Sequence, residues 1–445
     1  MRVLFIALGC DKNLVDAEVM LGLLATGGYE MTDHEEEAEI IVVNTCCFIQ
    51  EAKEESIEQI LEMATLKKEG NLKCLIVTGC MAQRYKKEII QEIPEVDAVV
   101  GTTSYDKILD VIHQTLAGKH TLLVQDADLN PVTSTKRLLT TGGHFAYLKI
   151  AEGCDKHCTY CIIPKIRGNF RSFPMENLIE EAKDLAGRGV KELIIIAQET
   201  TLYGVDLYGE KRLPQLLEEL CKISSFYWIR VMYCYPEEIT KDLLQVIAKE
   251  SKICNYLDIP IQHCNDEVLK RMGRRTTKED LTQIIGQIRK VIPDICLRTT
   301  LITGFPGESK EQHQELIEFV EEMRFDRLGV FTYSQEEDTP AATLDNQLPQ
   351  EVKEKRRNEI MEAQQKVAFE TGENLIGQEM LVMVEGEVAD EKAYVGRTFR
   401  DAPNVDGFIF VNTDTTLMSG DFINVTVTGA LEYDLIGGLT DELAQ

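Results

Sequence analysis

The chain has 445 residues, enough for two or three domains that each bury a core. Its 75 acidic and 47 basic side chains give a formal net charge of −28, which argues against broad contact with nucleic-acid phosphates and favours a basic partner. Thirteen cysteines indicate metal or redox chemistry in a reducing compartment instead of a disulfide scaffold. No apolar stretch approaches the ~18 residues of a membrane span, so we expect a cytoplasmic protein without a membrane partner.

The first part of the chain, residues 1–117, alternates strand-like and helix-like segments. Buried strands are predicted over 2–9, 39–45, 73–79 and 98–102, with helices between them. The apolar start runs into DKNLVDAE without a small-residue cleavage site, so it is predicted to be the first strand and not a signal peptide. The alternation predicts a flavodoxin-like α/β domain with a parallel sheet and helices on both faces.

Cysteines follow three of these strands, at Cys10, Cys46 and Cys80. Because ligands bind beyond the carboxyl ends of the strands in open α/β sheets, the three thiolates could converge on one site. Three small buried hydrophobic side chains are the alternative, since free cysteine usually behaves in that way. Two adjacent cysteines, Cys46 and Cys47, follow the second of these strands, and the sequence pattern alone does not show which of them belongs to the set.

Residues 118–142 lose periodicity and collect Asn, Pro, Ser, Thr and Gly, so we predict a linker there. Residues 143–372 then alternate again. Six strands are predicted over 146–151, 192–198, 228–234, 256–262, 296–304 and 327–333. Six βα units predict an open, partial (β/α)6 barrel, with functional loops at the carboxyl ends of its strands.

The first barrel strand leads directly into three cysteines at CxxxCxxC spacing, Cys154, Cys158 and Cys161. Thiolates this close on one tight loop can bind one iron–sulfur cluster and leave one iron without a protein ligand. A zinc knuckle is the alternative. Zinc usually takes four ligands, and the nearest extra ligand, His157, lies inside the loop, where we expect its side chain to point elsewhere.

This loop resembles the signature of the radical S-adenosylmethionine (SAM) enzymes, including the aromatic Tyr160 before the last cysteine. That resemblance implies a SAM site formed by polar groups and glycine turns at the other strand ends. The candidate SAM contacts are Gln198, Thr200, Gln262, Arg298 and Gly304. His263 fits a structural histidine equally well, and the remaining cysteines share no ligand spacing, so we interpret them as packing residues.

The last part, residues 373–445, changes to a period of two, with Gly, Asp and Asn at the turns. This pattern predicts a small five-stranded antiparallel barrel, similar to the TRAM domain. Barrels of this kind commonly bind RNA. The segment, however, carries 14 acidic and three basic side chains, a net −11, which suits a basic protein better than a phosphate backbone. We expect Asp401, Asp406 and Asp421 to contribute to docking of that partner.

The segments LGCDKNLVDAE, NTCCFIQEAKEES and GCMAQRY resemble the amino-terminal domain of the methylthiotransferases, and with the other two parts the resemblance covers nearly the whole chain. It implies a second four-iron cluster on Cys10, Cys46 and Cys80, with Cys46 chosen because the family motif places the ligand directly after Asn-Thr. It also implies that a 5′-deoxyadenosyl radical, formed from SAM at the first cluster, removes a hydrogen from the substrate. The second cluster then supplies the methylated sulfur.

Several stretches, among them ELIIIAQETTLYGVDLYG and VGRTFRDAPNVDGFIFVN, are more similar to one branch of this family than to the branch that modifies an adenosine of tRNA. The implied substrate is the β-carbon of an aspartate in protein twelve of the small ribosomal subunit, on the ribosome or its subunit. The implied cofactors are two 4Fe–4S clusters and SAM, and the implied electron donor is a flavodoxin or ferredoxin. Ile436 departs from the tryptophan common after EYDL. A tRNA enzyme and a non-catalytic iron–sulfur carrier are the alternatives.

Overall fold

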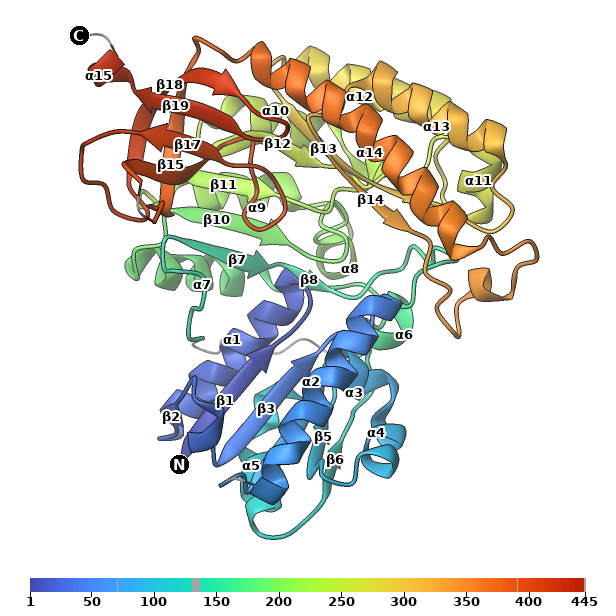
Figure 1. Ribbon diagram of the computed structural model, residues 1–445, viewed down its shortest axis with the longest axis vertical. Helices are drawn as coiled ribbons and strands as arrows, with labels where there is room; N and C mark the ends of the chain where they lie inside the picture. Colours follow the sequence, from blue (N-terminus) through green and yellow to red (C-terminus); the bar gives the residue numbers. More distant parts are fainter. Residues whose placement is uncertain (70, 130–136, 390, 444–445) are drawn as a thin grey trace.

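The computed structural model describes residues 1–69, 71–129, 137–389 and 391–443, and it contains three parts, each formed around its own sheet (Figure 1). The N-terminal domain lies below the other two parts, and the central sheet and the C-terminal barrel lie side by side above it. No helix among the described residues is long and apolar enough to cross a membrane.

The N-terminal domain contains a six-stranded parallel sheet in the order β2-β1-β3-β4-β5-β6. The strands are β1 (Arg2–Ala7), β2 (Glu30–Met31), β3 (Ile40–Thr45), β4 (Cys74–Gly79), β5 (Ala98–Val100) and β6 (Thr121–Leu123). The helices are α1 (Asp11–Thr26), α2 (Gln50–Glu69), α3 (Cys80–Arg84), α4 (Lys86–Glu92) and α5 (Ile108–Leu116). The predicted parallel α/β domain is confirmed.

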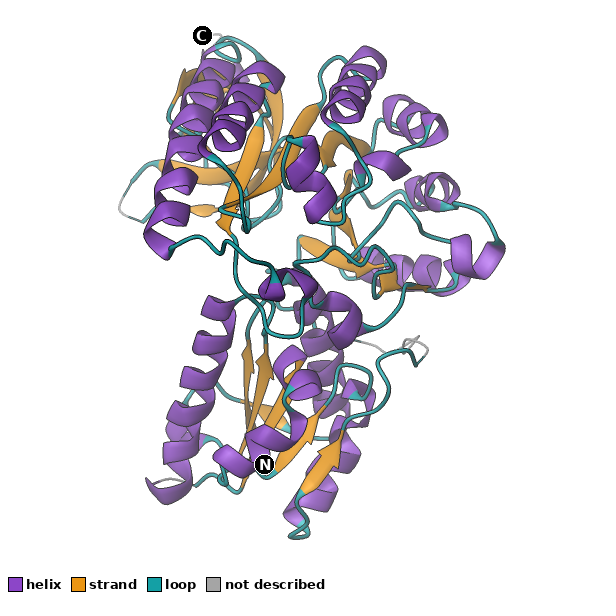
Figure 2. Ribbon diagram, turned by 90° about the vertical axis from the view of Figure 1, so that its right-hand side faces the viewer, coloured by secondary structure: helices purple, strands orange, loops and turns teal. Residues whose placement is uncertain are grey.

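Helices cover both faces of this sheet because its strands are apolar on both sides (Figure 2). In β3, Ile40 and Val42 pack with α1 and α5, whereas Ile41 and Val43 pack with α2, α3 and α4. The two edge strands, β2 and β6, were not predicted, since two or three residues carry no readable period. β6 lies inside the predicted linker, so the sheet continues past the expected boundary at residue 117. Part of that linker, residues 130–136, lies outside the described residues.

The central domain contains six parallel strands in the order β14-β13-β12-β11-β10-β7, which confirms the predicted open barrel. They are β7 (Phe145–Lys149), β10 (Glu192–Ile196), β11 (Trp228–Val231), β12 (Ile253–Asp258), β13 (Cys296–Thr303) and β14 (Arg327–Thr332). The helices are α6 (Ile163–Arg167), α7 (Met175–Gly187), α8 (Val205–Tyr208), α9 (Leu213–Cys221), α10 (Lys241–Lys249), α11 (Asp266–Arg271), α12 (Lys278–Val291), α13 (Lys310–Met323) and α14 (Gln350–Glu373). A two-stranded ribbon, β8 (Ala151–Glu152) and β9 (Arg171–Ser172), flanks the cluster loop.

The C-terminal part, here called the tail barrel, is a closed barrel in the order β15-β16-β17-β19-β18. Its strands are β15 (Glu379–Glu387), β16 (Ala393–Thr398), β17 (Ile409–Asn412), β18 (Phe422–Ala430) and β19 (Leu435–Leu439), and a short helix, α15 (Thr440–Leu443), follows. The predicted five-stranded barrel is confirmed, with one difference. β17 and β19 are parallel, so the barrel is not wholly antiparallel.

The tail barrel packs into the concave face of the central sheet through buried ion pairs. Glu192 on β10 pairs with Arg230 on β11 at 2.8 Å and with Arg397 of the tail barrel at 2.7 Å. Arg298 on β13 and Arg327 on β14 pair with tail-barrel carboxylates. These charges alternate along each strand with the apolar side chains that face the outer helices, as a period of two requires.

The expected surface role of two tail-barrel acids is wrong. Asp401 is 1% exposed and pairs with Arg327, and the Asp406 carboxylate, 2% exposed, pairs with Arg298 at 3.2 Å. Burial alone would raise the pKa of Asp401, but Arg327 and a hydrogen bond from Thr398 hold it below its ordinary value. The amino-acid composition includes these acids in the net charge, but it does not show that they are buried in ion pairs with the central domain. Asp406 and Asp421 are both partly exposed as whole residues, but the Asp406 carboxylate itself is buried in its ion pair.

We expect Asp401→Asn to destabilise the protein strongly, because it leaves the Arg327 guanidinium buried without its counter-charge. Removing one partner of a buried pair typically costs about 3–5 kcal/mol. Asp414→Asn is the matched control, since Asp414 pairs with Lys392 on the surface, where such pairs contribute about 0–1 kcal/mol. Denaturant unfolding of both variants measures the difference, and an equal stability of the two would contradict the buried pair.

Candidate active site

The cluster loop connects β8 to α6 and is fixed by hydrogen bonds on both sides. The amide of Cys154 donates to the carbonyl of Gly168 at 3.1 Å, and the amide of Thr159 donates to the carbonyl of Met272 at 2.9 Å. At Gly153, φ is +78°, and an added Cβ would lie 2.0 Å from the carbonyl oxygen of Asn169, so this position requires glycine. Contacts within the protein therefore hold this loop in one conformation.

The three cysteines of this loop are free thiols, and those of Cys154 and Cys158 are buried. Burial raises the pKa of Cys154 to about 12. The pKa of Cys161 is also raised, first by burial and then by the neighbouring Cys158 thiol. Such thiols stay protonated until a metal cation replaces the proton. The donor set and its burial fit an iron–sulfur cluster, although the ligand assignment remains a prediction.

The second set of cysteines lies at the carboxyl ends of three neighbouring strands of the first sheet. Cys10 follows β1, Cys46 follows β3, and Cys80 follows β4. Burial, together with the neighbouring Cys80 and Cys10 thiols, raises the pKa of Cys46 to about 12, so the three lie within electrostatic reach of one another. An added Cβ at Gly9 would lie 2.8 Å from the Cβ of Cys46. The structure thus brings these strand ends together.

The doublet after β3 separates into two environments. Cys46 lies beside Gly9 and near the thiols of both Cys10 and Cys80, whereas Cys47 packs with Cys80 in the apolar cluster under α2, α3 and α4. This supports Cys46 as the predicted ligand. Among the described residues, no group of three or more His, Cys, Asp or Glu side chains could hold a single metal ion. A four-iron cluster does not need such a group, because its thiolates bind different irons.

The predicted SAM contacts have different surroundings. Gln262 has φ of +70°, and its Oε1 is buried without a hydrogen-bond partner among the described residues. Gln198 Oε1 is also buried without a hydrogen-bond partner among the described residues, while Gln198 Nε2 donates to Glu152 at 2.7 Å. Free buried acceptors of this kind suit a polar ligand. Thr200 is different, since its hydroxyl donates to the carbonyl of Met232 at 2.8 Å and is fully buried.

Two further candidates are occupied by contacts within the protein. Arg298 donates to Asp258 at 2.8 Å and pairs with Asp406 of the tail barrel, so its guanidinium joins two domains. Gly304 has φ of +74°, and an added Cβ would lie 2.5 Å from Cγ of Lys353 on α14. Contact with α14 is therefore enough to explain this glycine, and neither residue is placed by the structure in an open site.

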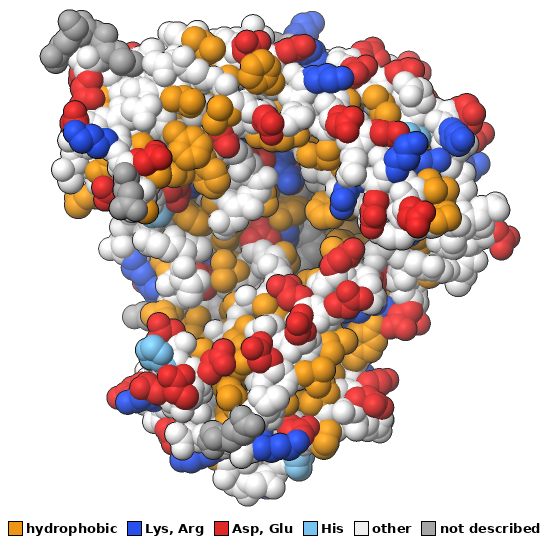
Figure 3. Space-filling view, viewed as in Figure 1, with side chains coloured by type: hydrophobic (Ala, Val, Ile, Leu, Met, Phe, Trp, Pro, Cys, Tyr) orange, Lys and Arg blue, Asp and Glu red, His pale blue; other side chains and the backbone are white. Residues whose placement is uncertain are grey.

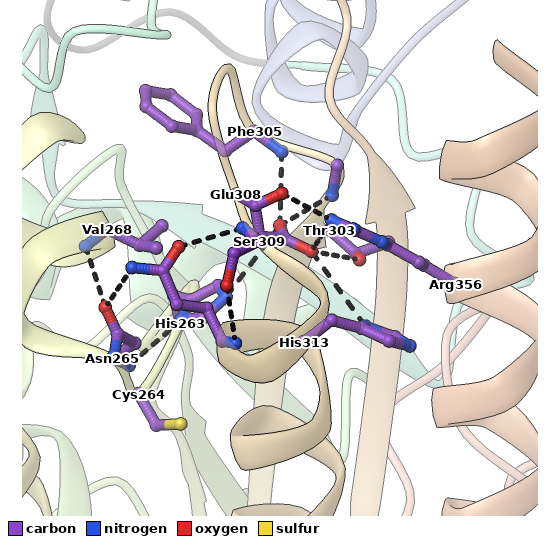
Figure 4. Close-up of polar contacts among 12 residues, drawn as sticks. His263, Cys264, Asn265, Val268, Thr303, Phe305, Glu308, Ser309, His313 and Arg356 are labelled. Carbon is purple, nitrogen blue, oxygen red and sulfur yellow. Dashed lines mark hydrogen bonds and ion pairs between the residues drawn. The ribbon is translucent and has the colours of Figure 1, made fainter. Parts of the chain in front are cut away.

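The loop after β13 is held by Glu308 (Figure 4). Its carboxylate, fully buried, accepts hydrogen bonds from the amides of Gly304 at 2.7 Å and Phe305 at 3.2 Å, and it pairs with Arg356 of α14 at 2.6 Å. His263 lies beside it, with Nδ1 accepting from the amide of Asn265. Burial lowers the pKa of His263 to about 3, so this histidine is neutral and structural, as one of the two interpretations predicted.

Two cavities lie where the N-terminal domain faces the carboxyl ends of the central strands. One, of about 160 Å³, is lined by residues that include Tyr160, Gln262 and Tyr333. The other, of about 290 Å³, is lined by Cys10 together with Tyr233 and a loop of the tail barrel, residues 403–405. Figure 3 shows this face of the molecule hollowed between the N-terminal domain and the two parts above it. The larger cavity is therefore lined by Cys10 itself, and the smaller one by Tyr160, the residue before Cys161.

Tyr233 is a site residue that sequence reasoning missed. Its φ is +62°, uncommon for a bulky residue and costly unless its surroundings hold it. Its hydroxyl donates to Asp11 at 3.1 Å, next to Cys10, and Lys12 Nζ lies 2.8 Å from the centre of its ring. Tyr233 lies two residues after β11, whereas the sequence pattern placed it inside the predicted strand 228–234.

Comparison with known proteins gives three family matches. Residues 2–101 match uncharacterized protein family UPF0004, residues 148–320 match the radical SAM superfamily, and residues 376–439 match the TRAM domain. The chain is 62% identical to the ribosomal protein uS12 methylthiotransferase RimO of Lachnoclostridium phytofermentans, over 98% of this chain and 99% of that protein. It is 52% identical to the protein of the same name from Clostridioides difficile, over 100% of both chains.

Solved structures share the fold at low identity. The chain is 12% identical to the radical S-adenosylmethionine methyltransferase TsrM from Kitasatospora setae, with a TM-score of 0.55 over 85% of this chain and 78% of that one. That structure contains cobalamin and a [4Fe-4S] cluster. This chain is 13% identical to the cobalamin-dependent S-adenosylmethionine radical enzyme OxsB, with a TM-score of 0.50 over 81% of this chain and 56% of that one. These similarities concern the fold.

Proposed function

The chain belongs to the RimO family of radical-SAM methylthiotransferases, and from that membership we propose that it adds a methylthio group to the β-carbon of an aspartate in protein uS12 of the small ribosomal subunit. The single observation that carries this proposal is 62% identity to a uS12 methylthiotransferase over nearly the full length of both chains. We further propose that the reaction takes place in the cytoplasm on the ribosome or its subunit, with a flavodoxin or ferredoxin as electron donor.

The proposal assigns one cluster to Cys154, Cys158 and Cys161 and a second to Cys10, Cys46 and Cys80. When bound, these clusters and SAM supply the radical that activates the aspartate and the sulfur that is transferred. The burial of Cys46, Cys80, Cys154 and Cys158, and the position of both sets at the carboxyl ends of strands, support this assignment. Gln198 and Gln262, with their free buried oxygens, are the better-supported SAM contacts.

The protein's own residues shape the space between the two sites. Tyr233 and Asp11 connect the carboxyl end of β11 to the residue after Cys10, and this contact fixes the spacing of the two domains. The cavity beside Cys10 is closed on one side by the tail-barrel loop that contains Asn404 and Val405. We assign this cavity to the substrate aspartate. Its walls come from all three parts of the chain, so they can exclude water from the reacting carbon.

The test is methylthiolation by the purified, cluster-loaded enzyme with SAM and a reductant. Isolated small ribosomal subunits and bulk tRNA are offered separately, and the products are analysed by mass spectrometry. We expect a methylthio group on one aspartate of uS12 and none on tRNA. Modified adenosine without modified uS12 would favour the tRNA alternative, and no transfer to either substrate while the clusters are loaded would favour an iron–sulfur carrier.

The surface charge of the tail barrel supports a basic substrate protein. Two of its three basic residues, Arg397 and Arg400, are buried in ion pairs with the central domain. Exposed acids remain at one end of the barrel. They are Glu387, Glu391, Asp414 and Glu442. Because Asp401 and Asp406 are buried along with the two arginines, the net charge of the outer surface stays near −11, and Lys392 is its remaining basic residue.

We expect the triple variant Glu387→Lys, Glu391→Lys and Asp414→Lys to bind uS12 with an association rate reduced by about tenfold, because electrostatic steering acts mainly on association. The difference should shrink as salt shortens the screening length to about 8 Å at physiological strength. Association kinetics at several salt concentrations measure it. A matched control changes Glu318, Glu321 and Glu322 on α13 to lysine, with the same change of net charge. Equal rates for both variants would contradict steering by the tail barrel.

A further inference from the structure

A buried charged network joins the N-terminal domain to the end of the cluster loop, and Arg167 is its centre. Arg167 is the last residue of α6, the short helix that begins two residues after Cys161. Its side chain is 2% exposed and extends out of the central domain into the N-terminal domain. Ile162, just before this helix, and Ile166, within it, pack in the core of the N-terminal domain, so the helix is anchored there.

The Arg167 guanidinium contacts a predicted ligand of the second cluster. Nη2 lies 3.5 Å from Sγ of Cys80 and donates to Asn13 Oδ1 at 3.0 Å. Its charge lowers the pKa of Cys80, opposing the larger effect of burial, and it acts in the same direction on Cys46. Arginine keeps its charge at any ordinary pH. A permanent cation from one domain therefore lies against the thiols of another.

The other side of the guanidinium is held by two carboxylates. Nη1 donates to Asp16 at 2.6 Å and to Glu152 at 3.3 Å. Lys149 pairs with both acids, and Gln198 donates to Glu152 at 2.7 Å. Two cations and two anions thus balance each other in a buried site, which is the condition under which such charges are tolerated. These contacts fix the orientation of the Arg167 guanidinium, so that its Nη2 faces the Cys80 thiol.

We propose that Arg167 is a positioning residue of the second cluster, supplied by the radical-SAM domain, which raises the reduction potential of that cluster. The inference rests on the proposed function, because it requires the cluster on Cys10, Cys46 and Cys80. An N–H···S hydrogen bond and a fixed positive charge both stabilise the more negative, reduced state, and such contacts are among those that set cluster potentials. Asp16 opposes this effect by partly neutralising the guanidinium.

The experiment measures the potential of the second cluster alone. In the full-length background Cys154→Ala, Cys158→Ala and Cys161→Ala, only that cluster is expected to remain. Redox titration followed by electron paramagnetic resonance then compares Arg167→Met, Arg167→Lys and Asp16→Asn with the background. Arg188→Met is the matched control, since Arg188 belongs to the same domain and pairs with Asp184 and not with the Arg167 network. Iron and sulfide are determined for each variant.

Arg167→Met should shift the potential down, Arg167→Lys should shift it less, and Asp16→Asn should shift it up, while Arg188→Met leaves it unchanged. The opposite signs distinguish a charge effect from simple damage, which would move Arg167→Met and Asp16→Asn in the same direction. Equal potentials for Arg167→Met and the background, with the cluster loaded, would overturn the proposal, and so would a background that binds no iron. Normal shifts together with unmodified uS12 would contradict the substrate assignment but not the role of Arg167.

Discussion

Cys80→Ala is expected to abolish methylthio transfer while SAM cleavage to 5′-deoxyadenosine continues. Cys80 begins α3 in the N-terminal domain, whereas the cluster loop is fixed by Gly168 and Met272 of the central domain. Loss of one thiol should therefore damage the sulfur-supplying site and leave the SAM-cleaving site intact. Chromatography of 5′-deoxyadenosine and mass spectrometry of uS12 measure the two activities in the same reaction.

Cys47→Ala is the matched control for this variant. Cys47 is buried in the same apolar cluster as Cys80, but Cys46 and not Cys47 lies against Gly9 next to Cys10, so we expect this variant to retain methylthio transfer. Loss of transfer in both variants would leave open which of Cys46 and Cys47 is the cluster ligand. Failure of Cys80→Ala to cleave SAM, with its first cluster loaded, would contradict separate tasks for the two sites.

The combined variant Cys154→Ala, Cys158→Ala and Cys161→Ala is expected to lose SAM cleavage completely and to retain roughly half of the iron, since two four-iron clusters hold equal amounts. The loop should stay folded, because the Thr159 hydroxyl donates to the carbonyl of Arg271 at 2.7 Å without any cysteine side chain. Iron analysis of the folded protein checks the result. Iron that disappears entirely, or does not change, would contradict independent sites.

The sequence predicted the sheets well because their strands are strongly apolar. In β3 and β4 every side chain is buried, which makes the strands visible as continuous runs. The edge strands β2 and β6 are too short for such a signal. The six predicted cluster ligands lie where the strand ends were expected, although their role as ligands is still to be tested.

Side-chain partners were the part that could not be predicted. Arg298 was expected to face SAM, and Asp406 was expected at the surface, but the two form a pair between domains. A residue's position along a strand shows which face of the sheet it occupies, not which distant segment covers that face. Arg167 was unrecognised for the same reason, since its contact with Cys80 joins residues 87 positions apart.

The ion pairs between the tail barrel and the central sheet have a consequence for protein engineering. Grafting the barrel of a tRNA-modifying relative onto this chain would be a natural way to exchange substrates. Glu192, Arg298 and Arg327 would then face whatever side chains the incoming barrel carries, and any missing counter-charge would be left in a dry interior. A functional chimera must therefore inherit both halves of each pair. The tail barrel and the central sheet that it packs against must therefore be exchanged together, although they look like separate domains.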